Sequence, residues 1–342
     1  MLRSGAVNVI RAMMGGLRPV IRARRAIFGP RRPTWTLELE TVAEVLRRSA
    51  NLSTVLPLQI QRRVIDPPRP VTKPMREVDM KPVDAGGVSA EWFSQPASDR
   101  SRVILYLHGG GYSTGSINSH RDFLARLCIA SGMRVLAADY RLAPEHPFPA
   151  QLEDTHRVYC WLIEELGIHP DHIVIGGESA GAGLTLSTLV SLRDAGLPLP
   201  AGAVLVSGWF DLDSRSTSMQ FNSHYDFVTR IGIRTMAKRF APRSEHSNPL
   251  VSPVHADMSG LPALLIQVGA AETLLDDNLR VAEAARSAGV EVKLEVWPDM
   301  IHAWHVFAPM LEEGRRAIAR IGEFVKERTA LADPAGLDAT RL

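Results

Sequence analysis

The chain has 342 residues, of which 45% are hydrophobic and 22% are charged, as in an ordinary globular protein with one large α/β domain or two medium ones. The formal net charge of +2 gives no general reason to expect a nucleic-acid partner. No stretch approaches the ~20 consecutive apolar residues that a membrane-spanning helix requires.

Residues 1–33 are strongly basic, because eight arginines precede the first acidic residue, Glu38. Gly15, Gly16 and Pro19 interrupt the helical phase, so we expect a solvated basic arm. Peripheral contact of this arm with an anionic membrane surface is the alternative. Arg11 interrupts the apolar run at residues 6–14, which makes the segment a poor signal peptide.

A lid-like N-terminal piece is expected to follow the arm. Thr34 is a candidate N-cap for a helix over residues 35–49, where apolar residues form a stripe. A proline-rich connector comes next, and proline at this density favours extended chain. Its prolines are Pro57, Pro67, Pro68, Pro70, Pro74 and Pro82.

From residue 76 onwards, short apolar strands alternate with helices. This alternation is typical of a mostly parallel central sheet covered by helices on both faces, so the predicted fold class is α/β. The predicted strands are residues 78–80, 88–93, 102–107, 135–140, 173–175, 203–207, 263–268 and 290–296; the predicted helices are residues 123–130, 152–166, 182–190, 274–288 and 312–328. The last strand, exposed at a sheet edge, would favour edge-to-edge pairing in a homodimer.

The alternation stops between residues 213 and 260, where the sequence is polar and aromatic without a core strand. This interval is too long for a plain connection, so we interpret it as a lid insertion over the carboxyl edge of the sheet. The predicted organisation is an arm, cap helix and connector at 1–75, a core in two parts at 76–212 and 261–330, the lid insertion at 213–260, and a flexible tail at 331–342.

The two cysteines, Cys128 and Cys160, both fall in predicted helices. Nothing in their spacing indicates a disulfide framework or a metal site, so we expect no metal and a cytoplasmic location.

A Gly-Glu-Ser-Ala-Gly run at residues 177–181 stands between a predicted strand and a predicted helix. A serine on such a tight turn needs small neighbours, which Gly177 and Gly181 supply. The turn would hold the Ser179 hydroxyl above the sheet, with amide N–H groups of the helix N-terminus facing developing negative charge. The pattern predicts a nucleophile, although the same run also occurs as a glycine-rich turn without chemistry.

A His-Gly-Gly-Gly run at residues 108–111 directly follows a predicted core strand. Three glycines leave backbone amides accessible to a substrate carbonyl oxygen, as an oxyanion hole requires. The spacing of a phosphate-binding loop is missing, which disfavours a phosphate cradle. His108 precedes the serine, and we expect it to form structural hydrogen bonds rather than act as the base.

A serine hydroxyl needs a base and a group that orients the base. His302 follows the last predicted strand and is preferred as the base over His305, one turn later. Glu272, on the loop after strand 263–268, is preferred as the acid. The alternatives that stay open are Asp276 and Asp277 in the next helical turn, and Asp211 and Asp213 after the preceding strand.

The runs at 108–111 and 177–181, together with Asp-Tyr-Arg-Leu-Ala-Pro-Glu at 139–145, resemble the hormone-sensitive-lipase-like family of bacterial carboxylesterases. The resemblance extends from about residue 76 to about residue 328. It implies an α/β-hydrolase fold with a helical lid, and hydrolysis of short-acyl esters. The order Ser179, Glu272, His302 matches the nucleophile-acid-base order of this fold.

By the same resemblance, the amides of Gly110, Gly111 and Ala180 are the expected oxyanion donors. Glu272 occupies a position where the family usually has Asp, and Gly-Glu-Ser-Ala-Gly has Glu where Asp is commoner. Arg141 and Glu145 are expected to form a buried, paired network without a catalytic role.

The predicted function is therefore a serine carboxylesterase that hydrolyses short- to medium-chain acyl esters through an acyl-serine intermediate, with no cofactor. The alternatives are an amidase or lactonase on the same triad, and a small-molecule receptor on a hydrolase scaffold. The expected partner is a small-molecule ester. Trp209, Phe210 and the aromatic residues between 221 and 227 are hypothetical walls of an acyl pocket.

Overall fold

The structure is a computed structural model that describes residues 5–53, 56–66 and 71–330. The predicted tail at 331–342 lies outside the described residues, as do the first four residues of the arm and Pro67, Pro68 and Pro70 of the connector. Among the helices of the described part, none combines the length and apolar character needed to cross a bilayer.

An eight-stranded sheet, in the order β1-β2-β4-β3-β5-β6-β7-β8, runs through the described residues. β1 and β2 are antiparallel to their neighbours, and β3 to β8 are parallel. The strands are β1 (Asp79–Asp84), β2 (Ser89–Ser94), β3 (Asp99–Leu107), β4 (Met133–Ala138), β5 (Ile173–Glu178), β6 (Gly202–Val206), β7 (Ala263–Gly269) and β8 (Val292–Trp297). β8 lies at one edge of the sheet, as predicted.

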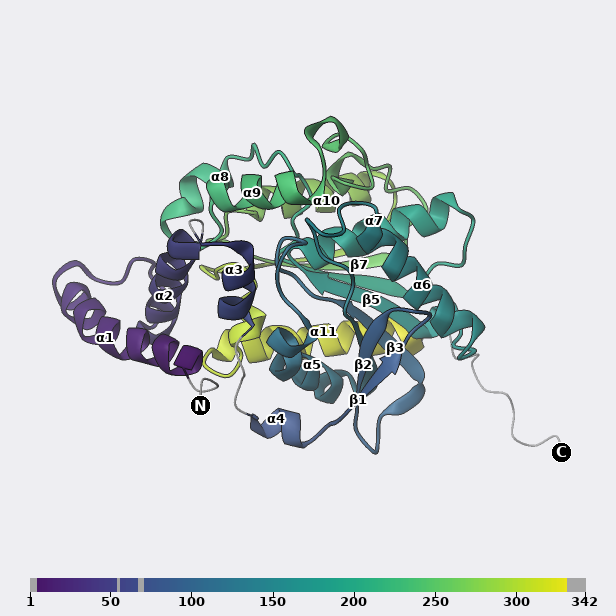
Figure 1. Cartoon of the computed structure of the whole chain (residues 1–342), viewed down its shortest axis with the longest axis horizontal. Helices are drawn as coiled ribbons and strands as arrows, with labels where there is room; N and C mark the ends of the chain where they lie inside the picture. The colour runs from purple at the N-terminus through teal and green to yellow at the C-terminus, as the bar shows by residue number, and fades with distance from the viewer. Residues whose placement is uncertain (1–4, 54–55, 67–70, 331–342) are drawn as a thin grey trace.

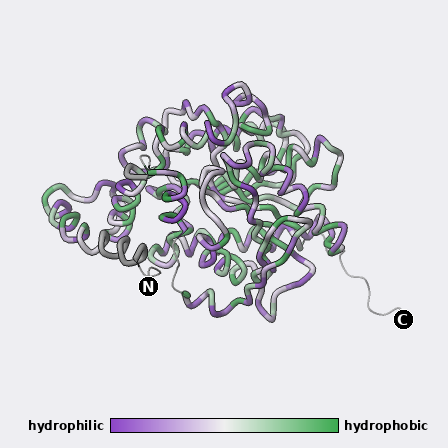
Figure 2. Tube along the Cα trace, viewed as in Figure 1, coloured by the Kyte–Doolittle hydropathy of each residue, from purple (hydrophilic) through white to green (hydrophobic). Residues whose placement is uncertain are grey.

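Helices cover both faces of the sheet (Figure 1). Leu105 of β3 belongs to the apolar cluster shared with α6 (Ala150–Glu164), α7 (Ala180–Asp194) and α10 (Leu275–Ser287). Its neighbour Tyr106 belongs to the cluster shared with α5 (Ile117–Ser131) and α11 (Glu312–Ala330). Successive strand residues point to opposite faces, so a strand buried on both sides is apolar throughout. Figure 2 shows hydrophobic stretches along these central strands. The predicted α/β fold class is confirmed.

The N-terminal segment differs from its prediction, because residues of the expected arm form helix α1 (Gly5–Phe28), which packs on α2 (Leu37–Ser53). Arg24 and Arg25 both bond to Glu40, whose side chain is buried. These ion pairs with α2 supply tertiary contacts that outweigh the poor helix propensity of glycine and proline. The predicted break in helical phase is therefore wrong for the described residues, whereas most residues from Gly15 to Phe28 are exposed, in agreement with a solvated segment.

The cap helix and the connector also differ in detail. The side chain of Thr36, rather than Thr34, accepts the backbone N–H of Leu39 in the first turn of α2. The Thr34 hydroxyl instead donates to Asp299, which leads into the loop after β8. The connector contains two helices, α3 (Leu58–Ile65) and α4 (Lys73–Arg76). Pro57 precedes α3 and Pro74 lies in the first turn of α4, where a missing N–H costs nothing.

The insertion at 213–260 contains α8 (Ser218–Phe221) and α9 (Arg230–Phe240), and its described residues form no strand. Phe240 of α9 stacks on Tyr112, with ring centroids 3.7 Å apart. Tyr112 follows the loop at the carboxyl end of β3, so α9 covers that end of the sheet. Five 3₁₀ turns complete the described elements, at Pro170–His172, Asn222–His224, Arg243–Glu245, Pro253–His255 and Trp304–Phe307.

Candidate active site

Ser179 lies on the turn between β5 and α7 with φ +55° and ψ −119°, a backbone conformation that non-glycine residues rarely adopt. The turn is held by backbone bonds, since Ser179 N donates to Val206 O at 2.9 Å. A Cβ on Gly181 would lie 2.0 Å from Leu107 O, and one on Gly177 would lie 2.6 Å from the same oxygen. Both glycines are therefore required by close backbone approach, as the sequence motif predicts.

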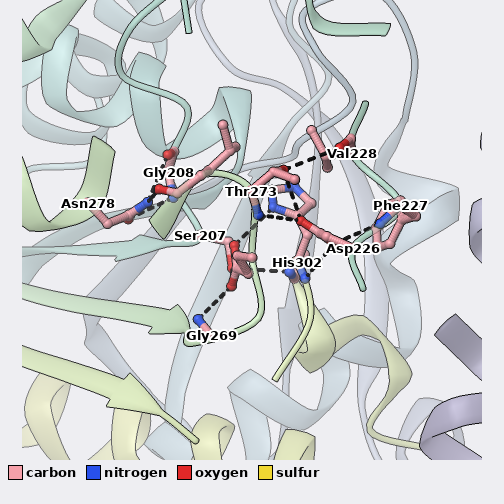
Figure 3. A network of polar contacts seen from close by, with 12 residues as sticks. Ser207, Gly208, Asp226, Phe227, Val228, Gly269, Thr273, Asn278 and His302 are labelled. Atoms are coloured by element: carbon pink, nitrogen blue, oxygen red, sulfur yellow. Dashed lines mark hydrogen bonds and ion pairs between the residues drawn. The ribbon is translucent and has the colours of Figure 1, made fainter. Parts of the chain in front are cut away.

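His302 and Glu272 lie on the loops after β8 and β7 and contact each other through a hydrogen bond of 3.1 Å between Nδ1 and Oε2. Both side chains are buried. The second oxygen of Glu272, Oε1, accepts the Ser207 hydroxyl at 2.6 Å and the Gly269 N–H at 2.7 Å. β5, β6, β7 and β8 are consecutive in the sheet, so their carboxyl ends carry Ser179, Ser207, Glu272 and His302 along one edge. Figure 3 shows Ser207 and His302 in this network.

The carboxylate of Glu272 sets the charge state of the imidazole. Burial taken by itself lowers the pKa of His302, but the hydrogen bond and negative charge of Glu272 outweigh it. Asp226 and Glu178 act in the same direction, so the pKa of His302 is raised above its ordinary value of 6.5. An imidazole so oriented carries its proton on Nδ1, toward the carboxylate.

The alternative acids are held by other groups. Asp276 accepts the backbone N–H of Ser218 at 2.8 Å, and Asp211 pairs with Arg280 at 2.9 Å. Asp213 pairs with His246 at 2.8 Å. Asp277 is buried, and burial raises the pKa of its carboxyl to about 8. Of the five candidate acids, Glu272 is the one whose carboxylate forms a hydrogen bond with the imidazole of His302.

The His-Gly-Gly-Gly loop follows β3 and turns tightly. Gly110 has φ +115° and Gly111 has φ +61°, and a Cβ on either would lie 2.1 Å from another atom. For Gly111 that atom is Met236 Sδ of the insertion, so the lid closes directly over this loop. No hydrogen bond between described residues occupies the backbone N–H of Gly110, Gly111 or Ala180. These three amides remain available to a ligand.

Glu178, the residue before the serine, is the centre of a buried network that sequence reasoning missed. Its carboxylate accepts the Gly109 N–H and the Tyr106 hydroxyl, and lies 2.7 Å from Nε2 of His120. The other ring nitrogen of His120 is 3.0 Å from Ser116 O, a carbonyl that only accepts. Nδ1 also lies 2.9 Å from the Ser119 hydroxyl, so His120 connects Glu178 to the first turn of α5. Burial raises the pKa of Glu178, but His120, the Tyr106 hydroxyl and His108 together outweigh burial and hold this pKa below its usual range.

Two further residues missed from the sequence are Ser207 and Asp226. Ser207 has φ +48° and bonds both Glu272 and the N–H of Ala303. Asp226, from the insertion, is buried and accepts the His302 N–H at 3.1 Å. A serine directly after a core strand was a weak signal, whereas nothing in the local sequence around Asp226 marks its role.

The two remaining histidines of the motifs are structural in the observed geometry. Nδ1 of His108 lies 2.7 Å from Gly109 O, and the ring stacks on Tyr140. His305 Nε2 lies 2.8 Å from Gln267 Oε1. Burial lowers the pKa of His108 to about 4 and that of His305 to about 3, so both are neutral at pH 7.

The expected network between Arg141 and Glu145 is wrong. Arg141 pairs with Asp154 at 2.8 Å, whereas Glu145 pairs with Arg62 of α3 at 2.7 Å. The Glu145 side chain is 47% exposed, so neither the pairing nor the burial holds. The N-terminal cap supplies a partner that the motif itself does not contain.

The aromatic residues proposed as pocket walls are divided by the structure. Phe227 packs edge-on against the His302 ring, with ring centroids 5.6 Å apart, whereas Phe221 is 67% exposed. Trp209 and Phe210 belong to the main apolar core. Among the described residues, no group of three or more His, Cys, Asp or Glu side chains is arranged to hold a metal ion.

The family model described as an α/β hydrolase fold matches residues 104–306. An acetyl-hydrolase from Streptomyces hygroscopicus is 45% identical over 248 residues, which cover 72% of this chain and 82% of the relative. The crystal structure of an esterase from the bacterial hormone-sensitive lipase (HSL) family aligns with a TM-score of 0.82 at 41% identity, covering 86% of this chain and 99% of that one. The crystal structure of EstE5 soaked by p-nitrophenyl butyrate aligns with a TM-score of 0.82 at 42% identity, covering 86% and 100%.

Together with the fold, these matches identify the class. The chain belongs to the α/β hydrolase fold family and, within it, to the bacterial hormone-sensitive-lipase-like carboxylic ester hydrolases. The family and the class of enzyme that the three sequence motifs predict are confirmed.

Proposed function

We propose that the protein is a serine carboxylesterase that hydrolyses short- to medium-chain acyl esters, with Ser179 as nucleophile, His302 as base and Glu272 as the orienting acid. The observation that carries this proposal is the hydrogen bond between His302 Nδ1 and Glu272 Oε2. Because Nδ1 donates to the carboxylate, Nε2 is the nitrogen that can accept a proton from the serine hydroxyl.

The reaction is a two-step acyl transfer. Ser179 Oγ attacks the ester carbonyl carbon while His302 Nε2 takes its proton, and the carbonyl oxygen becomes an oxyanion. The bond to the alcohol oxygen then breaks, and His302 protonates the leaving alcohol. Water attacks the acyl-serine in the same way, giving its proton to His302, and the carboxylic acid leaves as Ser179 regains its proton.

The oxyanion is stabilised in this proposal by the amides of Gly110, Gly111 and Ala180. Their N–H groups are not engaged by other described residues, and Ala180 begins helix α7, whose N-terminus favours negative charge. The removal of one such donor in comparable sites costs ~10²–10³ in kcat.

The acyl-chain preference is proposed from the side chains that the insertion brings to the site. Phe227 lies against His302, and Met236 lies against Gly111. These two apolar groups narrow the space around the reacting atoms, which favours shorter acyl chains. In a series of p-nitrophenyl esters, kcat/KM should be highest for butyrate or octanoate and should fall for palmitate.

The catalytic proposal is tested with Ser179→Ala, and Ser191→Ala in helix α7, which follows the turn, is the matched control. The control should keep p-nitrophenyl butyrate turnover and covalent labelling by a fluorophosphonate probe, whereas Ser179→Ala should lose both. Labelling or turnover retained by Ser179→Ala would overturn the assignment. A panel of anilides and lactones separates an esterase from an amidase or lactonase, which would use the same residues.

Membrane contact by the N-terminal segment stays a prediction. Val20, Ile27 and Phe28 of α1 are exposed, which supports contact, whereas Arg24 and Arg25 are occupied by Glu40 and offer less charge to lipid headgroups. Co-sedimentation of the full chain with phosphatidylserine vesicles tests this, with Phe28→Ser as the variant expected to bind less.

A homodimer and a cytoplasmic location are also proposals. The edge position of β8 and the exposure of Val296 support edge-to-edge pairing. Light scattering should give the mass of a dimer, and Val296→Lys should reduce this mass to that of a monomer.

The free thiols Cys128 and Cys160 support a location in a reducing compartment, and cell fractionation tests this location. In a separate test, a mobility-shift assay should find no binding of nucleic acid.

A further inference from the structure

Asp226 is a buried carboxylate that the insertion contributes to the loops after β7 and β8. Its Oδ1 accepts the backbone N–H of His302 at 3.1 Å and that of Phe227 at 2.9 Å. Its Oδ2 accepts the backbone N–H of Thr273 at 2.9 Å and the Thr273 hydroxyl at 3.0 Å. Figure 3 shows the side chain of Asp226 between His302 and Thr273.

These contacts require two acceptor oxygens. The backbone N–H groups of His302, Phe227 and Thr273 only donate, so Oδ1 and Oδ2 both accept, which the single oxygen of an Asn side chain could not do. The Thr273 hydroxyl also lies 3.3 Å from Val228 O. The side chain is 1% exposed, so water does not replace a lost bond without rearrangement. Two of the residues that Asp226 holds are Thr273, which directly follows Glu272, and His302. One side chain therefore bonds to both the loop after β7 and the loop after β8.

The insertion holds the acid loop from a second side as well. The Asn222 side chain donates to the backbone oxygen of Glu272 at 2.8 Å, and the Ser218 hydroxyl donates to that of Thr273 at 2.8 Å. Asp226 therefore belongs to a wider attachment of the insertion to this loop, but it is the member that also reaches His302.

We propose that Asp226 is a positioning residue, through which the lid insertion holds the loops of Glu272 and His302 in register, so that catalysis depends on the seated lid. This inference rests on the proposed roles of Ser179, Glu272 and His302. Asp226 touches neither substrate nor reacting atoms, and it acts through the backbone of the two loops.

The charge of Asp226 supplies a readout that a purely structural contact would not change. The titratable groups that act electrostatically on His302 are Glu272, Asp226, Glu178 and His305, and Arg47 of α2 and Asp226 act on each other. The negative charge of Asp226 favours the protonated imidazole and thereby raises the pKa of His302. Loss of that charge should lower this pKa.

The test compares Asp226→Asn with Asp213→Asn, a matched variant that removes an insertion carboxylate bonded to His246 rather than to the two loops. With p-nitrophenyl butyrate, Asp226→Asn should lower kcat by ~10-fold with little change in KM. The acidic limb of its kcat/KM profile should move to lower pH. Asp213→Asn should leave both unchanged.

A folded Asp226→Asn protein with wild-type kcat, or with reduced kcat and an unmoved acidic limb, would overturn the inference. If this variant does not fold, Thr273→Val and Thr273→Ser decide. Thr273→Val loses the hydroxyl donor and should lower kcat, whereas Thr273→Ser keeps it and should restore activity; equal kcat in the two would also overturn the inference. The same assay on Ser179→Ala separates the two proposals, because activity in that variant would defeat the proposed function itself.

Discussion

The backbone N–H of Gly109 donates a hydrogen bond to the buried carboxylate of Glu178, so the glycine loop after β3 is tied to the residue that precedes Ser179. His120 pairs with the same carboxylate from helix α5. The bond fixes the position of the loop relative to the serine, and the proposed oxyanion donors Gly110 and Gly111 follow directly on the tied residue.

Replacement of Glu178 by Gln should therefore disturb the oxyanion loop. Gln keeps one acceptor oxygen for Gly109 and His120, which both contact Oε1, but it places an NH2 donor opposite the Tyr106 hydroxyl and removes the negative charge beside His120. We expect kcat for p-nitrophenyl butyrate to fall by ~10–100-fold with a smaller change in KM, because a displaced amide weakens transition-state stabilisation. Glu165→Gln, at an exposed position at the end of α6, removes the same charge and should behave as wild type. A wild-type kcat in Glu178→Gln would show that the bond does not position the loop.

The pH profile should report the charge of Glu272. A general base is active when unprotonated, and the pKa of His302 is raised above 6.5, so the acidic limb of kcat/KM should lie above pH 6.5. Glu272→Gln removes the charge that raises this pKa, so the limb should move to lower pH while kcat falls by ~10⁴. Asp276→Asn should keep the wild-type limb and rate. A larger loss in Asp276→Asn than in Glu272→Gln would contradict the choice of acid.

The nucleophile turn should tolerate no side chain at residue 181. A Cβ there would lie 2.0 Å from Leu107 O, so Gly181→Ala should lower the free energy of unfolding by ~1–3 kcal/mol or more. Gly16→Ala is the matched control, since its Cβ meets nothing within 4 Å. In the interior of α1 it should gain ~0.5–1 kcal/mol through better helix propensity. Thermal unfolding of both variants measures the difference, and equal melting temperatures would refute the steric requirement.

Asp277 should make stability fall as pH rises. Burial, with the nearby charge of Asp211, raises the pKa of its carboxyl from 3.8 to about 8 in the folded protein. Between these values the unfolded chain ionises while the folded protein retains the proton, so folding is progressively penalised as pH rises from 3.8 to 8. The full penalty is on the order of 5 kcal/mol.

Asp277→Asn removes this ionisation. Its melting temperature should exceed that of wild type at pH 8.5, and the advantage should shrink toward pH 5. Asp276→Asn, one residue earlier in the same helical turn, should show no such pH-dependent gain. An Asp277→Asn protein with the wild-type pH dependence of unfolding would mean that the carboxyl is ionised in the folded state at neutral pH.

The sequence was sufficient for features whose cause is local. Alternation of apolar strands and helices predicted the α/β fold, because a strand covered on both faces must be apolar throughout. The glycines around Ser179 and in the 108–111 loop were recognised from their spacing, although the atoms that a Cβ would meet at Gly181 and Gly111, Leu107 O and Met236 Sδ, belong to distant segments. The proximity of Glu272 and His302 could be expected because the loops that follow successive parallel strands meet at one edge of the sheet.

Tertiary structure decided the contacts between distant segments. Asp226 lies 76 residues before His302, whose backbone N–H donates a hydrogen bond to it. Ser207 lies 65 residues before Glu272, to which its hydroxyl donates. Glu40 pairs with arginines of the segment that the sequence predicts to be a solvated arm. Arg62 pairs with Glu145, which the sequence predicts to be the partner of Arg141. A local motif specifies the backbone of a turn, but which buried carboxylate meets which donor depends on how the lid, the cap and the sheet pack together.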